Sequence, residues 1–323
     1  FNMKYQVIAR KFRPQVFGEV VGQRPIVQTL QNAISMGRTG HAYVFFGPRG
    51  VGKTTMARIL AKGLNCVDGP TVTPCNVCPS CMEITAGQSL DVLEIDAASN
   101  TGVDNVRELR DSTRYAPSRD RNKIFIIDPA NAMNASSTNA LLKGLEEPPE
   151  HSFFFLLTPN VHELLMTVRS RSQIYHFSPL PVSELVRHGV SDELVARWSR
   201  GSIGRARSTA ASDIREQREP LIRFLELAAS ANETTFRGML EASNHISRSK
   251  ADFSNHLEVT SILVQDLVYL KAGLPDQIVN IDIRTRMEGL ANSMTLSRLA
   301  AMGDLLKFME SASKKDRKST RLN

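Results

Sequence analysis

The sequence predicts an α/β domain in its first half and an all-helical second half. Short apolar runs, of the kind that form buried parallel strands, occur at residues 43–46, 91–95, 123–127 and 153–157. Segments with helical apolar spacing lie between these runs, and alternating strands and helices predict a parallel sheet flanked by helices. From about residue 214 onward only the helical spacing recurs.

Composition sets wide limits on function. The chain has 323 residues, 41% of them hydrophobic, which is enough for two or three packed domains. No apolar run approaches the about 20 residues that a membrane span needs, so no membrane association is expected. The first residues lack the apolar segment of a signal peptide, so we expect a cytoplasmic protein. The net charge of +7 is compatible with an anionic partner such as nucleic acid.

One stretch fits the P-loop pattern G-x-x-x-x-G-K-[ST] without a mismatch, and it lies between an expected strand and an expected helix. Main-chain N–H groups of such a loop cradle phosphate oxygens at a helix N-terminus. Lys53 is expected to reach the β- and γ-phosphates, and Thr54 to hold Mg²⁺ through its hydroxyl. A chance glycine-rich turn is the alternative, which the context disfavours. The expected phosphate-binding residues are Gly47, Gly50, Val51, Gly52, Lys53, Thr54 and Thr55.

All four cysteines fall in one short stretch with the spacing C-x8-C-x2-C-x2-C: Cys66, Cys75, Cys78 and Cys81. Cytosolic chains rarely keep disulfides, and C-x2-C spacing is typical of metal sites. Four thiolates can surround a tetrahedral Zn²⁺, and no open ligand position is evident, so we expect a structural zinc knuckle. Four unrelated thiols are the alternative.

Four motifs, in order, resemble the gamma/tau subunits of the bacterial DNA polymerase III clamp loader, which are AAA+ ATPases. They are the lead-in at residues 9–15 and 20–23, the P-loop, the four-cysteine insertion, and the stretch at 94–100 with 102–104. The resemblance implies ATP as the nucleotide. The lead-in packs on the adenine in that family, which implies an adenine-side role for Tyr5, Arg10, Val21 and Gly22.

The resemblance also implies a domain organisation. Residues 1–177 would form the AAA+ module with its zinc knuckle, and residues 178–212 a small helical lid. Residues 213–312 would form the helical collar that joins subunits into a ring, followed by a disordered basic tail at 313–323. A helix expected at about 103–114 carries arginines on one face, which would lie toward DNA by this resemblance or would simply be solvated.

Several catalytic roles follow from the same resemblance. Asp128 ends an apolar strand and would hold Mg²⁺, while Thr158 stands at the position that senses the γ-phosphate. Arg171, in a run similar to the family's Ser-Arg-Cys motif, would reach the ATP of a neighbouring subunit as an arginine finger. The family usually has Asp-Glu where this chain has Asp128 and Pro129, and proline has no proton acceptor, so hydrolysis by this chain stays open.

From residue 122 onward the chain looks more like the delta-prime subunit of the same assembly, which donates an arginine finger but is usually a poor ATPase. Position 204, where gamma/tau has its sensor arginine, holds glycine, with Arg205 next. Two functions therefore remain. The first is an ATP-binding clamp-loader subunit that works with other loader subunits, the sliding clamp and primer-template DNA. The second is a delta-prime-like stator that hydrolyses little or no ATP.

Overall fold

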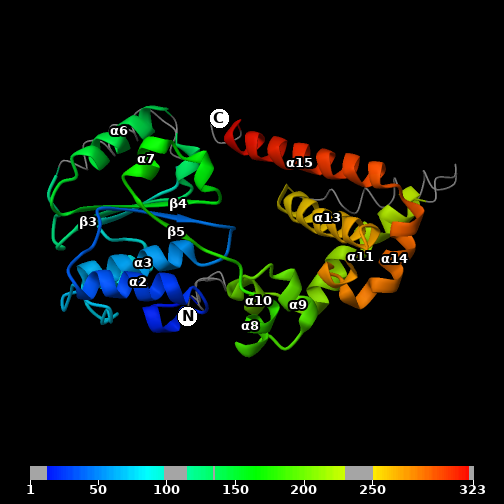
Figure 1. Ribbon diagram of the computed structural model, residues 1–323, viewed down its shortest axis with the longest axis horizontal. Coiled ribbons are helices and arrows are strands. Elements are labelled where there is room, and N and C mark those ends of the chain that lie inside the picture. Colours follow the sequence, from blue (N-terminus) through cyan, green and yellow to red (C-terminus); the bar gives the residue numbers. More distant parts are fainter. Residues whose placement is uncertain (1–12, 98–114, 134, 230–249, 320–323) are drawn as a thin grey trace, which may run out of the picture. The chain divides into compact units, whose positions relative to one another are not determined.

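The structure, a computed structural model, describes residues 13–97, 115–133, 135–229 and 250–319 (Figure 1). Its internal contacts divide the chain into two compact units. The first unit runs to Glu184 and takes in Gly201–Arg205, while the second comprises Leu185–Arg200 and the chain from Ala206 onward. The expected helix at 103–114, with Arg107, Arg110 and Arg114, lies outside the described residues.

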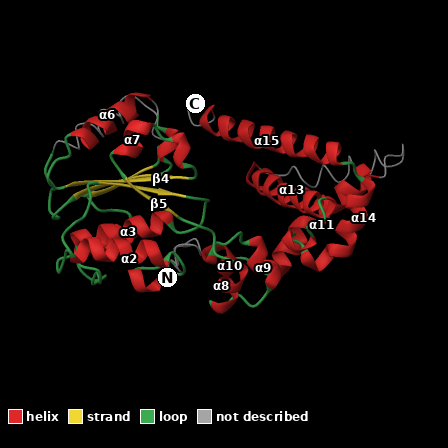
Figure 2. Ribbon diagram, viewed as in Figure 1, coloured by secondary structure: helices red, strands yellow, loops and turns green. Residues whose placement is uncertain are grey.

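The first unit is built on a five-stranded sheet in which every strand pair is parallel (Figure 2). The strand order is β2-β3-β4-β1-β5, so the first strand of the chain lies between the two last ones. Nearly continuous apolar runs form these strands because helices cover both faces of the sheet. The predicted α/β fold is confirmed. The strands are β1 (Ala42–Phe46), β2 (Val92–Ile95), β3 (Lys123–Ile127), β4 (Ser152–Thr158) and β5 (Gln173–His176).

Two apolar cores lie on opposite faces of this sheet, because successive side chains of a strand alternate between its faces. On β1, Tyr43 and Phe45 pack into one core and Val44 into the other. Helices α2 (Arg24–Ser35) and α3 (Lys53–Asn65) cover the first face, and α6 (Ala135–Glu146) and α7 (Met166–Ser170) cover the second (Figure 1). The rest of this unit includes η1 (Phe17–Glu19), α4 (Pro79–Ala86), η2 (Ala130–Ala132) and η3 (Val161–Glu163).

The second unit is helical throughout its described residues, as the apolar spacing predicts. A buried polar network fastens its helices. Arg218, 2% exposed, donates to the side chains of Asn280 and Asp282, while the fully buried Asp266 accepts from the main-chain N–H of Asn280 at 2.9 Å. Its helices are α9 (Glu193–Trp198), α11 (Ala211–Ala229), α13 (Lys250–Lys271), η4 (Pro275–Gln277), η5 (Ile281–Ile283), α14 (Arg284–Ser293) and α15 (Leu296–Ser319).

Two short helices cross the boundary between the units, α8 (Val182–Arg187) and α10 (Ile203–Ser208). The three-domain division drawn from the sequence stays a prediction. The expected disordered tail at 313–323 is corrected in part, because α15 continues as a helix to Ser319. Among the described residues, no helix has the length and apolar character to cross a membrane.

Candidate nucleotide site and cysteine cluster

The P-loop joins β1 to α3 at the carboxyl edge of the sheet. Gly47, Gly50 and Gly52 have φ angles of 143°, 83° and 100°, in the region that L-residues rarely adopt. A Cβ on Gly47 would lie 2.1 Å from the main-chain oxygen of Phe177, so only glycine fits there. Lys53, Thr54 and Thr55 begin α3, and Val51 packs against the core beside them. The loop thus has the backbone that a phosphate cradle needs.

Lys53 is buried inside its own loop. Its side chain is 9% exposed, and its Nζ donates to the main-chain oxygens of Gly47 at 2.5 Å and Pro48 at 2.7 Å. Burial lowers the pKa of Lys53, the charge of Asp128 opposes that shift, and Arg49 adds to it. Two carbonyl acceptors therefore hold the ammonium at the place where nucleotide phosphates would offer stronger, charged ones.

Thr54 and Asp128 meet across the end of β4. The Oγ1 atom of Thr54 donates to Oδ2 of Asp128 at 2.9 Å, and the Asp128 main-chain N–H donates to Ile95 at 3.0 Å. A hydroxyl and a carboxylate side by side are the oxygen ligands that P-loop proteins offer to Mg²⁺. The structure thus brings these two side chains together, and their role in holding Mg²⁺ stays a prediction. Pro129 follows directly and offers no proton acceptor.

Thr158, at the end of β4, is fully buried next to the loop. Its main-chain oxygen accepts from the Gly47 N–H at 3.2 Å, and its hydroxyl lies 3.3 Å from Oδ1 of Asn131. Asn131 in turn donates to the carboxylate of Glu163. Sequence reasoning missed both Asn131 and Glu163. The available signal was their position just after strands β3 and β4, where the carboxyl edge of a parallel sheet collects polar residues.

For the other predicted site residues the structure gives less direct information. Gly22, φ 67°, lies against Leu180, because a Cβ there would come within 2.2 Å of a Leu180 methyl group. Val21 precedes it on the same partly buried segment, and Tyr5 and Arg10 lie outside the described residues. Arg171 forms an ion pair with Glu146 at 3.1 Å and donates to the Thr167 main-chain oxygen at 3.1 Å. Neither of these partners belongs to the P-loop.

A segment far along the chain reaches the P-loop within the first unit. A Cβ on Gly50 would lie 2.8 Å from Oγ of Ser202 and 4.0 Å from Cδ of Arg205. Ser202, directly before α10, and Arg205 of α10 therefore lie against the phosphate loop. The family resemblance places the sensor arginine at position 204, which is glycine in this chain. In the structure the neighbouring Arg205 lies near the loop.

The four cysteines gather at the C-terminal end of α3. Their sulfur atoms all lie within 4.8 Å of one another, and three of the four residues are buried. The Cys75 N–H donates to Sγ of Cys66 at 3.4 Å, and the Cys78 N–H to Sγ of Cys75 at 3.3 Å. Main-chain N–H groups of residues 77 and 78 lower the pKa of Cys75 to about 7, whereas burial raises the pKa of Cys81.

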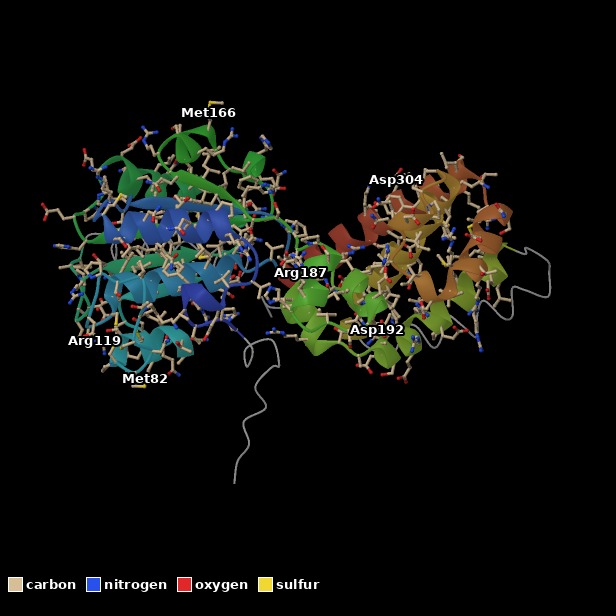
Figure 3. The ribbon with its side chains drawn as sticks, turned by 60° about the horizontal axis from the view of Figure 1, so that its bottom comes forward. Met82, Arg119, Met166, Arg187, Asp192 and Asp304 are labelled. Atoms are coloured by element: carbon tan, nitrogen blue, oxygen red, sulfur yellow. The ribbon has the colours of Figure 1, made fainter. Side chains whose placement is uncertain are left out.

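This arrangement fits a metal ion. Four free thiols converge, three of them buried, and main-chain donors point at sulfur atoms, as they do around tetrahedral thiolate centres. The fourth cysteine, Cys81, lies on α4 directly before Met82, which Figure 3 labels together with Arg119 on the first unit. Arg119 pairs with Glu83 of α4 at 2.8 Å and so fastens this helix to the body of the unit.

Parallel sheet, P-loop, strand-end carboxylate and cysteine insertion together define an AAA+ nucleotide-binding module. The family described as "DNA polymerase III, delta subunit" matches residues 22–181. DNA polymerase III subunit tau of Escherichia coli (strain K12) is 49% identical over 201 residues, 61% of this chain and 31% of the relative. Subunit tau of Bacillus subtilis (strain 168) is 48% identical over 184 residues, 57% of this chain and 33% of the relative.

The gamma/tau subunit of Mycobacterium tuberculosis (strain ATCC 25618 / H37Rv) is 51% identical over 174 residues, 53% of this chain and 30% of the relative. Over these stretches the chain is similar to gamma and tau subunits of DNA polymerase III. The chain spans about a third of the length of the tau subunits from E. coli and B. subtilis, 31% and 33%. A gamma subunit-related protein of Thermotoga maritima has a TM-score of 0.46 at 19% identity, covering 84% of this chain and 98% of that one.

Proposed function

We propose that the chain is an ATP-binding subunit of a DNA polymerase III clamp loader, which helps to place the sliding clamp on primed DNA during replication. The observation that carries the proposal is the meeting of Thr54, Asp128 and the buried Lys53 at one edge of a sheet. The identity of about half to gamma/tau subunits supports the assignment. Its partners would be other loader subunits, the clamp and primer-template DNA, in the cytoplasm.

In this proposal ATP is a conformational ligand. Lys53 would exchange its two carbonyl acceptors for β- and γ-phosphate oxygens, while Thr54 and Asp128 would hold Mg²⁺. Arg205 is the residue that we propose for a contact to phosphate from the helical segment, and Val21 and Gly22 would line the adenine side. Binding would favour the ring state that grips clamp and DNA, because a ligand shifts a conformational equilibrium by its differential affinity.

Arg171 would serve a neighbouring subunit. Its side chain is 37% exposed and pairs with Glu146 on the surface of the first unit, so it is accessible to a second chain. A guanidinium directed at another subunit's γ-phosphate stabilises the charge that develops on the transferring phosphoryl group. Thr158 would monitor the same phosphate from within its own site.

The cysteine cluster would hold Zn²⁺ with a structural role. Four thiolates fill the tetrahedral coordination of zinc and leave no position for water or substrate. Metal binding would therefore stabilise the fold of the segment between α3 and α4, because the ligands come from separate turns that the ion ties together.

A delta-prime-like stator is the second candidate function, and Pro129 is the observation that favours it. Proline cannot polarise the attacking water, so turnover by this chain would need another residue. The gamma/tau identity of the relatives above favours the first candidate. We infer that the two candidates differ in turnover and agree in nucleotide binding.

Nucleotide binding and turnover, measured side by side, test this proposal. The chain should bind Mg-ATP and co-elute with delta and delta-prime subunits and the clamp of a bacterial DNA polymerase III. Thr54→Ala should weaken Mg-dependent binding. Thr29→Ala is the control, because it removes a threonine hydroxyl on α2 that donates to the Pro25 main-chain oxygen, and it should leave the binding unchanged. Failure to bind both ATP and the loader subunits would refute the proposal. Turnover that appears only in Pro129→Glu would favour the stator.

A further inference from the structure

Lys62 is a lysine buried near the C-terminal end of α3, beside the cysteine cluster. It is 1% exposed, and its Nζ donates to three side-chain oxygens: Asn76 Oδ1 at 2.7 Å, Gln15 Oε1 at 2.8 Å and Thr85 Oγ1 at 3.4 Å. An ammonium has three N–H donors, so these bonds use all of them. Each acceptor is neutral, and no ion pair of Lys62 occurs among the described residues.

The three acceptors come from three segments that converge at the cluster. Asn76 lies in the loop between the second and third cysteines and has a left-handed backbone, φ 61°. Thr85 is on α4, and its hydroxyl donates to the main-chain oxygen of Cys81 at 2.9 Å. Gln15 belongs to the lead-in segment before η1. One ammonium on the P-loop helix therefore joins the cysteine loop, the helix of the fourth cysteine and the lead-in.

A buried cation without a partner of opposite charge is costly, because neutral hydrogen bonds replace only part of its hydration. Burial accordingly lowers the pKa of Lys62. Four thiolates on one divalent ion would carry a net charge of about −2. Such a centre supplies the missing countercharge, and buried Lys62 would in turn lower the cost of that charge.

We propose that Lys62 is the countercharge of the metal-bound cysteine cluster and positions it against α3. The inference rests on the zinc site proposed above. Arg121 supports it from the other side of the cluster, because its guanidinium donates to the main-chain oxygens of Cys66 at 3.1 Å and Val67 at 2.8 Å. A neutral side chain at position 62 would leave the charge of the metal centre less compensated, and the ion would be held more weakly.

Zinc retention by the full chain tests the role of Lys62. Lys62→Gln removes the charge but keeps N–H donors, and Lys62→Arg keeps the charge. We expect Lys62→Gln to lose zinc to a chromophoric chelator with an affinity about 10–100-fold weaker than the unmodified chain, the usual effect of residues behind metal ligands. Lys62→Arg should recover part of this loss. Lys123→Gln is the matched control, because Lys123 is 7% exposed in the same unit.

A thermal readout separates positioning from general stability. Zinc should raise the Tm of the unmodified chain, and Lys62→Gln should shrink that rise, whereas Lys123→Gln should lower the zinc-loaded and zinc-free Tm together. Equal zinc affinity of Lys62→Gln and the unmodified chain would overturn the inference. An unmodified chain that binds ATP and loader subunits but no zinc would also overturn it, and the proposed loader function would survive.

Discussion

Replacing Lys53 by methionine removes the ammonium from the P-loop while keeping an unbranched side chain of similar length. The ammonium donates to two carbonyl oxygens, at 2.5 and 2.7 Å. Binding of nucleotide would exchange these acceptors for phosphate oxygens, so the number of hydrogen bonds changes little. The main contribution to binding that Lys53→Met removes is therefore the attraction between the ammonium and the phosphate charge.

That attraction sets the magnitude of the effect. Two unit charges about 4 Å apart at an effective dielectric constant of about 20 attract by about 4 kcal/mol. Since each 1.4 kcal/mol is about tenfold in affinity, Lys53→Met should raise the Kd for Mg-ATP about a thousandfold. The free energy of unfolding should change much less, because the same substitution removes a buried charge together with its two hydrogen bonds.

Titration of a fluorescent ATP analogue at fixed ionic strength measures the change in Kd, and chemical denaturation measures stability. Lys123→Met is the control, because Lys123 has a similar exposure, 7% against 9%, at the start of β3, the edge opposite the P-loop. It should leave the Kd unchanged. An affinity of Lys53→Met within about fivefold of the unmodified chain would contradict the charge argument, since 4 kcal/mol cannot give so small a change.

The remaining predictions concern stability. Gly47→Ala should destabilise the protein about 1–3 kcal/mol more than Gly52→Ala in denaturant titrations, because both add a Cβ at positive φ but only Gly47 meets a main-chain carbonyl, at 2.1 Å; equal losses would contradict the close contact. Burial raises the pKa of Asp91, but main-chain N–H groups of residues 118–120 outweigh it and the net shift is downward. Asp91 should thus stabilise the fold above its ordinary pKa of about 3.9 and lose that contribution as pH falls through its lower folded value, so Asp91→Asn should flatten acid unfolding curves. Removal of metal by a chelator should lower the Tm of the unmodified chain but not of Cys81→Ser, and an equal fall in both would argue against the cysteine site.

Much of the candidate site could be predicted from the sequence because its residues lie in local patterns. The P-loop, the strand ending in Asp128 and the cysteine spacing are each short and chemically specific. That Thr54 and Asp128 lie close together was also expected, since the P-loop follows one apolar strand and Asp128 ends another, and carboxyl ends of parallel strands meet at one edge of the sheet. The fold class followed from apolar runs and helical spacing for the same reason.

What the sequence did not predict depends on tertiary contact. Lys62 belongs to an ordinary helical stretch, and only folding brings Asn76, Gln15 and Thr85 to its ammonium. Arg205 lies near Gly50 across more than 150 positions of sequence, a distance that no periodic pattern spans. The helix of the last segment continues past residue 313 because the charged residues there are good helix formers, although their composition suggested a solvated tail.

The strand order has a consequence for how the protein is made. Among the described strands β1 leaves the ribosome first, yet its two neighbours in the sheet are β4 and β5, the last two of them. Roughly 130 residues separate the ends of β1 and β5, which at about 5–20 residues per second is roughly 6–26 s of synthesis. During that interval the apolar segment at 42–46 has neither of its partners. The nascent chain therefore exposes an unpaired apolar strand until β4 and β5 emerge, and unpaired strands of this kind are prone to aggregation.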